Sequence, residues 1–93
     1  MKRTIAVLGA TGSIGTQTLD MVRRYPEQFQ ADCLVAHSSA EKLFALVREF
    51  RPKVAALAVE PDFIPEDVRF CQWFFGQHCS VSALKAAKSQ DAL

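Results

Sequence analysis

Three glycines at intervals of three, placed directly after an apolar run, constrain this chain more than any other feature. Residues 4–8 read Thr-Ile-Ala-Val-Leu, a pattern that predicts a buried strand. Gly9, Gly12 and Gly15 follow, and a helical pattern comes after them. A strand that turns tightly into a helix leaves the first N–H groups of the helix without backbone partners, at the positive end of the helix dipole. Such a helix start suits a phosphate.

Each glycine has a separate expected role in this turn. Gly9 permits the tight turn, Gly12 lets a pyrophosphate approach the backbone, and Gly15 lets the helix pack closely against the strand. The spacing is G-x-x-G-x-x-G and not the more familiar G-x-G-x-x-G, so it supports a dinucleotide site without naming an enzyme. The alternative is a strand-to-helix turn that binds nothing, because glycines also punctuate ordinary loops.

The rest of the chain alternates between strand and helix patterns. Further strands are predicted over residues 31–36, 54–59 and 68–75, the last with aromatic side chains on both faces. The first helix is expected to start at an N-cap Ser13, to end before Pro26, and to bury one face. That face comprises Ile14, Thr18, Met21, Val22 and Tyr25.

Two further helices follow from capping signals. A capping box of Ser38 and Glu41 predicts the start of a helix whose inner face is Leu43, Leu46, Val47 and Phe50. Ser80 is expected to cap a last helix with Val81, Leu84 and Ala87 on its inner face.

This element order predicts an α/β fold, a Rossmann-like doubly wound parallel sheet with a β-α-β-α-β unit, a fourth strand and a last helix. A doubly wound dinucleotide fold has two halves, and only the half that holds adenosine and pyrophosphate is complete here. We therefore expect residues 1–93 to be the truncated N-terminal part of an NADPH-binding domain from a longer protein.

The turn after the second predicted strand bears on the choice of dinucleotide. NAD-specific folds place an Asp or Glu there, but residues 36–39 read Ala-His-Ser-Ser, while Asp32 is at the wrong end of the strand. The imidazole, the hydroxyls and the helix start offer donors that suit the 2′-phosphate of NADP, and Lys42 adds charge. The alternative is that Ser38 and Ser39 only cap the helix, and the two roles are compatible.

Composition excludes several classes of protein. The formal net charge is +1 with acids and bases interleaved, which argues against nucleic-acid binding. No apolar stretch approaches the roughly 18 residues of a membrane span, and the N-terminal apolar run is too short for a signal peptide. Cys33, Cys71 and Cys79 lack the paired spacings of a zinc site and are expected to be reduced thiols of a cytoplasmic protein.

The glycine turn and the residues after it resemble the opening of the 1-deoxy-D-xylulose 5-phosphate reductoisomerase family. The likeness rests on Gly-Ala-Thr-Gly-Ser-Ile-Gly at 9–15, Thr-Gln-Thr-Leu-Asp-Met-Val-Arg at 16–23, Pro-Glu-x-Phe at 26–29, and Glu-Phe-Arg-Pro-Lys at 49–53. It is strong over residues 4–60 and thin beyond them.

The resemblance implies an enzyme that uses NADPH and a divalent metal, Mg or Mn, to convert 1-deoxy-D-xylulose 5-phosphate to 2-C-methyl-D-erythritol 4-phosphate in non-mevalonate isoprenoid biosynthesis. It implies a full-length homodimer whose catalytic and metal-binding residues lie in a later domain, so residues 1–93 alone are expected to be inactive. The implied cofactor contacts are Thr11, Gly12, Ser13, Ile14, His37, Ser38 and Ser39. The family usually has a glycine at position 37 and often a basic residue at position 38, so this chain departs from the pattern there.

The glycine spacing alone leaves other functions open. Semialdehyde or acyl-phosphate dehydrogenases and extended short-chain reductases share it, but they need a cysteine nucleophile or a Tyr-Lys pair later in the chain. A non-catalytic NADP sensor is an alternative of a different class.

Overall fold

The computed structural model describes residues 2–91, which form one four-stranded parallel sheet with helices on both faces. The strands are β1 (Arg3–Leu8), β2 (Phe29–Ala36), β3 (Val54–Leu57) and β4 (Gln72–Phe75), in the spatial order β1-β2-β3-β4. The helices are α1 (Ser13–Arg24), α2 (Ala40–Phe50) and α3 (Cys79–Asp91), with a short 3₁₀ turn at Glu66–Val68. The predicted α/β doubly wound fold is confirmed.

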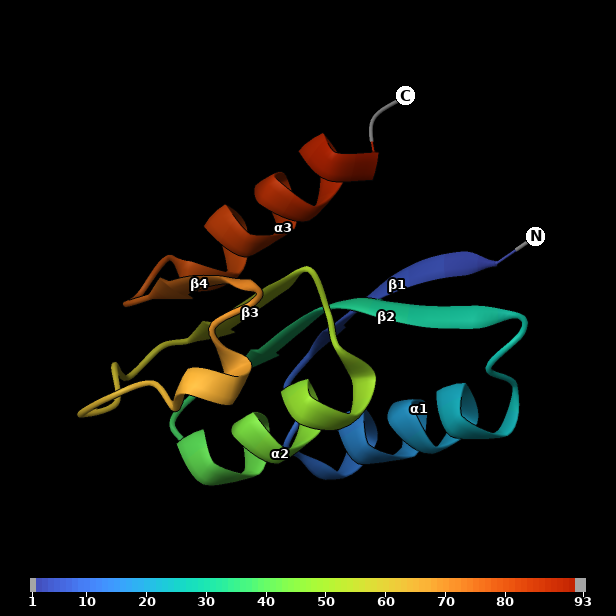
Figure 1. Ribbon diagram of the computed structural model, residues 1–93, viewed down its shortest axis with the longest axis horizontal. Coiled ribbons are helices and arrows are strands. Elements are labelled where there is room, and N and C mark those ends of the chain that lie inside the picture. The colour runs from blue at the N-terminus through green and yellow to red at the C-terminus, as the bar shows by residue number, and fades with distance from the viewer. Residues whose placement is uncertain (1, 92–93) are drawn as a thin grey trace.

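The sheet separates two apolar layers (Figure 1). Helices α1 and α2 lie on one face, where Leu19 and Leu43 pack against β2 and β3 residues such as Leu34. Helix α3 crosses the other face, where Ala83 packs with Cys33 and other small side chains. Because both faces are covered, β2 and β3 carry nearly continuous apolar runs, as parallel strands require.

Strand β2 carries one extra residue relative to β1. Ile5 pairs with Ala31 and Ala6 pairs with Cys33, so Asp32 is left over at a bulge. Asp32 is buried, and its Oδ1 accepts a hydrogen bond from Gln30 Nε2 at 2.7 Å. This carboxylate lies within the strand and away from its carboxyl end, where a ribose-binding acid would have to be.

The fourth predicted strand is only partly correct. Residues 66–68 form the 3₁₀ turn, and the strand is limited to Gln72–Phe75. Trp73 and Phe75 pack against the α1–α2 side, while Phe74 packs against the α3 side, so the prediction of aromatic contacts on both faces is confirmed. The indole N–H of Trp73 donates to the Val68 carbonyl at 2.9 Å and joins the turn to the strand. The third strand is also shorter than predicted, since it ends at Leu57.

The buried faces of two helices differ from the sequence prediction. In α1 the buried residues are Gly15, Leu19 and Val22, whereas Ile14 is 78% exposed and Met21 and Tyr25 are also exposed. Because Gly15 lets α1 pack tightly on the turn, the observed buried face of the helix is shifted by about one residue from the predicted face. In α3 the buried residues are Cys79 and Ala83, and Val81 is exposed. The predicted Leu84 and Ala87 are partly buried and pack against this cluster, so that part of the predicted face is confirmed. The predicted inner face of α2 is confirmed by Leu43 and Val47, with Leu46 and Phe50 partly buried.

All three predicted caps are wrong by one position or more. The N-cap of α1 is Gly12 and that of α2 is Ser39, and neither helix has a side-chain cap hydrogen bond. The capping box of Ser38 and Glu41 therefore does not form. Ser80 lies inside α3, which starts at Cys79.

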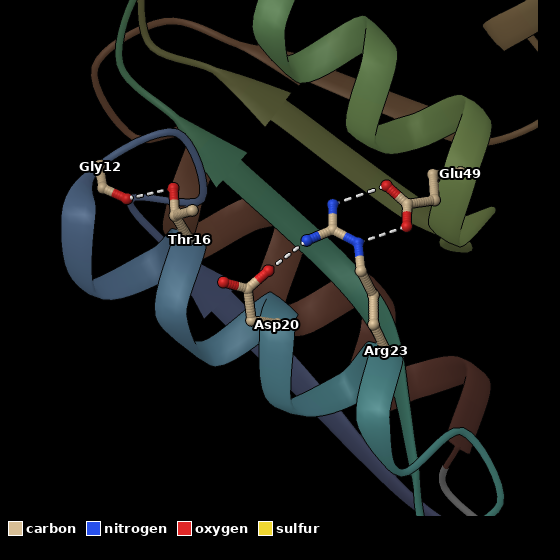
Figure 2. A network of polar contacts seen from close by, with 5 residues as sticks. All are labelled: Gly12, Thr16, Asp20, Arg23 and Glu49. Carbon is tan, nitrogen blue, oxygen red and sulfur yellow. Dashed lines mark hydrogen bonds and ion pairs between the residues drawn. The ribbon is translucent and has the colours of Figure 1, made fainter.

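An ion-pair network joins α1 to α2 on the exterior (Figure 2). The Arg23 guanidinium donates to both carboxylate oxygens of Glu49, at 2.5 and 2.7 Å, and to Asp20 Oδ1 at 2.5 Å. The two-point contact fixes the angle between the guanidinium and the carboxylate. The network therefore helps to hold the two helices side by side.

This network predicts a measurable dependence of stability on pH. The hydrogen bond from Arg23 lowers the pKa of Glu49 below its ordinary value of 4.5, so the pair stabilises the fold above that pH. The stabilisation is lost as pH falls through the lowered pKa. Both side chains are about 40% exposed, which limits the contribution to less than about 1 kcal/mol.

Urea unfolding between about pH 6 and about pH 3 tests this expectation, because the wild type should lose more stability than Glu49→Gln over that range. A Glu27→Gln variant is the control, since Glu27 is exposed in the turn after α1. Parallel pH profiles for the wild type and Glu49→Gln would contradict the assignment.

Candidate functional site

The glycine turn connects the end of β1 to the start of α1 and is tied to β2. Gly9 has a φ of 68°, in the left-handed region that glycine adopts without strain, so its predicted turn role is confirmed. Its carbonyl accepts the Gly12 N–H at 2.9 Å, which closes the turn. The Ala10 N–H donates to the Val35 carbonyl at 2.8 Å. The turn is therefore anchored beside the carboxyl end of β2.

The other two glycines meet very different surroundings. A Cβ on Gly15 would lie 2.1 Å from the Gly9 carbonyl oxygen and 2.8 Å from the Ala10 Cα, so close packing of helix and turn requires glycine there. A Cβ on Gly12 would lie 3.4 Å from the Gly9 oxygen, and the Gly12 φ is −84°. The fold thus requires Gly15 but leaves room for a side chain at Gly12, on the exposed side of the turn.

The first turn of α1 presents backbone donors to solvent. The Gly12 carbonyl accepts the Thr16 N–H at 2.9 Å. It also accepts the Thr16 hydroxyl at 2.7 Å (Figure 2). In the described part of the chain no side chain caps this helix and no acid lies in its first turn. Gly12 and Ser13 are exposed, and so is the Ile14 side chain. The positive end of the helix dipole is thus open to an anion.

The second candidate cluster follows β2 directly. His37, Ser38 and Ser39 are exposed, and Ser39 is the N-cap of α2. The His37 carbonyl accepts the Val59 N–H at 2.8 Å, and the Ser38 carbonyl accepts the Ala40 N–H at 2.8 Å. These bonds occupy carbonyl oxygens and leave the imidazole and hydroxyl groups facing solvent.

The fold brings both clusters to one edge of the sheet. Leu8 pairs with Val35, so β1 and β2 end together, and each continues into an exposed turn and a helix start. In doubly wound folds ligands bind outside the carboxyl ends of the strands. The nine residues brought to this edge are Gly9, Thr11, Gly12, Ser13, Ile14, Gly15, His37, Ser38 and Ser39.

A groove next to the glycine turn contains residues that the sequence reasoning missed. It has a volume of about 330 Å³ and is lined by Ala10, Thr11, Thr16, Lys42, Ala45 and Leu46. The sequence indicates Lys42 only as added charge for the 2′-phosphate, and it assigns Thr16 no role at the site. Because the groove joins residues about 30 positions apart, neither helix pattern alone could have revealed it.

The described residues offer no set of ligands for the divalent metal that the resemblance implies. Among residues 2–91 with described side chains, no three His, Cys, Asp or Glu side chains come together as a metal site would require. The three cysteines are free and buried, and burial raises the pKa of Cys33 and of Cys71 to about 11. In the same part of the chain no helix is long and apolar enough to cross a membrane.

Comparison with known proteins decides the family. The profile of the 1-deoxy-D-xylulose 5-phosphate reductoisomerase family matches residues 5–88. The chain belongs to this family. The resemblance that the sequence motifs indicated is therefore confirmed, and it extends further along the chain than residues 4–60.

Curated relatives and solved structures agree with this assignment. The reductoisomerase of Cyanothece sp. strain PCC 7425 is 53% identical over 58 residues, which are 62% of this chain and 15% of the relative. That of Ralstonia pickettii is 57% identical over 53 residues, 57% of this chain and 13% of the relative.

Among solved structures, the Zymomonas mobilis enzyme in complex with NADPH has a TM-score of 0.74 and 30% identity, covering 89% of this chain and 23% of that chain. A reductoisomerase in complex with NADPH, fosmidomycin and magnesium has a TM-score of 0.73 and 28% identity, covering 87% of this chain and 21% of that one. The matched part of this chain covers only about 13–15% of the length of the two curated relatives above.

Proposed function

We propose that residues 1–93 are the N-terminal portion of the NADPH-binding domain of a 1-deoxy-D-xylulose 5-phosphate reductoisomerase. The observation that carries this proposal is the contrast between Gly12 and Gly15. Internal packing requires the glycine at position 15 but not the one at position 12. A ligand that must approach the backbone explains a glycine that the fold itself does not need.

The chain's own residues would divide the work of binding. The amides of Thr11, Ser13 and Ile14 hold the pyrophosphate, which approaches the backbone at Gly12, while Gly9 and Gly15 keep the turn in shape. The Gly12 N–H itself donates to the Gly9 carbonyl. His37, Ser38 and Ser39 donate to the 2′-phosphate of the adenosine ribose. A solved relative carries NADPH in its complex, which supports this choice of dinucleotide.

The remaining functions would belong to the longer protein. It would convert 1-deoxy-D-xylulose 5-phosphate to 2-C-methyl-D-erythritol 4-phosphate in isoprenoid biosynthesis, as a cytoplasmic homodimer. A relative's complex contains magnesium, but no ligand set for a metal forms among the described side chains here. The Mg or Mn ion would bind in a catalytic domain, and residues 1–93 alone would not catalyse the reaction. The family match favours this reaction over those of semialdehyde dehydrogenases and short-chain reductases.

Titration of the purified chain with NADPH and with NADH tests the proposal. We expect NADPH to bind at least about tenfold more tightly, because the 2′-phosphate adds a charge that the donors after β2 can bind. Calorimetry or nicotinamide fluorescence measures both affinities. Failure to bind either dinucleotide would contradict the proposed function, and equal affinities would contradict the assignment of His37, Ser38 and Ser39.

A further inference from the structure

We propose that Lys42 is a specificity-determining residue that binds the 2′-phosphate of NADPH through its ammonium group. This inference rests on the proposed function, and it adds a residue from the α1–α2 groove to the donors after β2. The observations that support it are the position of Lys42, the charges around it, and the lack of an acid at the end of β2.

The position of Lys42 connects the two candidate clusters. Lys42 lies in the first turn of α2, three residues after the N-cap Ser39, and it lines the groove together with Thr11 and Thr16. The same side chain is thus next to both the glycine turn and the turn after β2. In a doubly wound fold the adenosine ribose lies over the end of the second strand, and its 2′ position is bound by residues just beyond that end.

Acidic side chains line the hollow on one side of α2, and Lys42 lines the groove on the other side. Glu41 lines a different hollow together with Glu60 and Asp62, toward the loop after β3. The lining of the Lys42 groove contains no acidic residue. In the described part of the chain Lys42 forms no ion pair, whereas Arg48 on the same helix is paired with Asp67. The lysine charge is therefore available to a phosphate.

The chemistry distinguishes the two dinucleotides. At neutral pH a phosphate monoester carries a charge of about −1.5 to −2, and an ammonium group binds it as a point charge with three donors. The ribose of NADH has a neutral hydroxyl at the same place, so loss of the lysine charge should affect NADPH far more than NADH. A carboxylate that would favour the hydroxyl is missing from residues 36–39.

The experiment compares matched variants of the whole chain. Lys42→Met removes the charge but keeps the length of the side chain, and Lys42→Arg restores a cation. Lys85→Met makes the same charge change at an exposed position on α3, which covers the other face of the sheet. The dissociation constants of NADPH, NADH, adenosine 2′,5′-bisphosphate and 5′-AMP are measured for each variant, and urea unfolding reports whether each variant is folded.

We expect Lys42→Met to weaken NADPH and adenosine 2′,5′-bisphosphate by about tenfold and to change NADH and 5′-AMP by less than about twofold. Lys42→Arg and Lys85→Met should stay within about threefold of the wild type. An unchanged NADPH-to-NADH ratio in a folded Lys42→Met variant overturns the inference while leaving the proposed function intact. A wild-type chain that binds neither dinucleotide overturns both.

Discussion

Replacing Gly15 with alanine is expected to unfold the chain or to reduce its stability by several kcal/mol. The added Cβ would lie 2.1 Å from the Gly9 carbonyl oxygen, and that oxygen cannot easily move. The turn is held by the Gly12 N–H on that same oxygen and by the bond from Ala10 to Val35. The clash can be relieved only by moving α1 away from the turn, which loosens the packing of Leu19.

The alanine at position 15 has two opposing effects on stability, and the destabilising one is larger. Alanine in place of glycine favours a helix by up to about 1 kcal/mol, whereas overpacking against rigid backbone costs about 1–3 kcal/mol or more. A small domain has only about 5 kcal/mol of stability to lose. Urea unfolding followed by circular dichroism measures the difference.

Gly12→Ala is the matched control for this experiment. It adds the same methyl group at 3.4 Å from its nearest neighbour, at an ordinary φ, and should change the stability by less than about 1 kcal/mol. Equal unfolding midpoints for Gly15→Ala and the wild type would show that the turn is not rigid.

The second large expected effect comes from Ser13→Asp, which should raise the stability of the fold but weaken NADPH binding. Ser13→Asp places a carboxylate in the first turn of α1, where no acid lies at present, and should stabilise the helix by about 0.3–1 kcal/mol through the dipole. The same carboxylate would face the pyrophosphate. Two like charges about 4 Å apart repel by about 1–4 kcal/mol in surroundings between water and protein surface. NADPH affinity should therefore fall by at least about tenfold.

Ser80→Asp provides the control, because it makes the same substitution in the first turn of α3. That helix follows β4, three strands away from β1, at a distance of roughly 14 Å across the sheet. Stability and NADPH affinity are measured together for both variants. A Ser13→Asp variant that binds NADPH as tightly as the wild type would place the pyrophosphate elsewhere.

The sequence predicted those parts of the site that depend on local backbone constraints. Gly9 and Gly15 were assigned the roles that the structure gives them, because a left-handed turn and a close backbone approach leave few alternatives to glycine. The order of strands and helices was also predictable, since strands buried on both faces produce continuous apolar runs.

The errors arose where local signals compete with tertiary packing. Serine is a frequent N-cap, and Ser13 and Ser38 both fit that pattern. The observed N-caps, Gly12 of α1 and Ser39 of α2, each lie one position away from the predicted serine. Ile14 is apolar and was expected inside, yet it is exposed because Gly15 occupies the position against the turn. The groove around Lys42 depends on how α1 and α2 pack together, which no single helix pattern contains.

The hydrogen bond between Ala10 and Val35 lowers the entropy cost of ligand binding. It links the loop before α1 to the strand before α2, so the places proposed for the two phosphate groups are held at a set spacing before a ligand arrives. Ordering a mobile loop on association costs about 0.5–1.5 kcal/mol for each immobilised side chain, and a preorganised receptor avoids that entropy loss. A dinucleotide would then have to restrict mainly its own torsions to match this edge of the sheet.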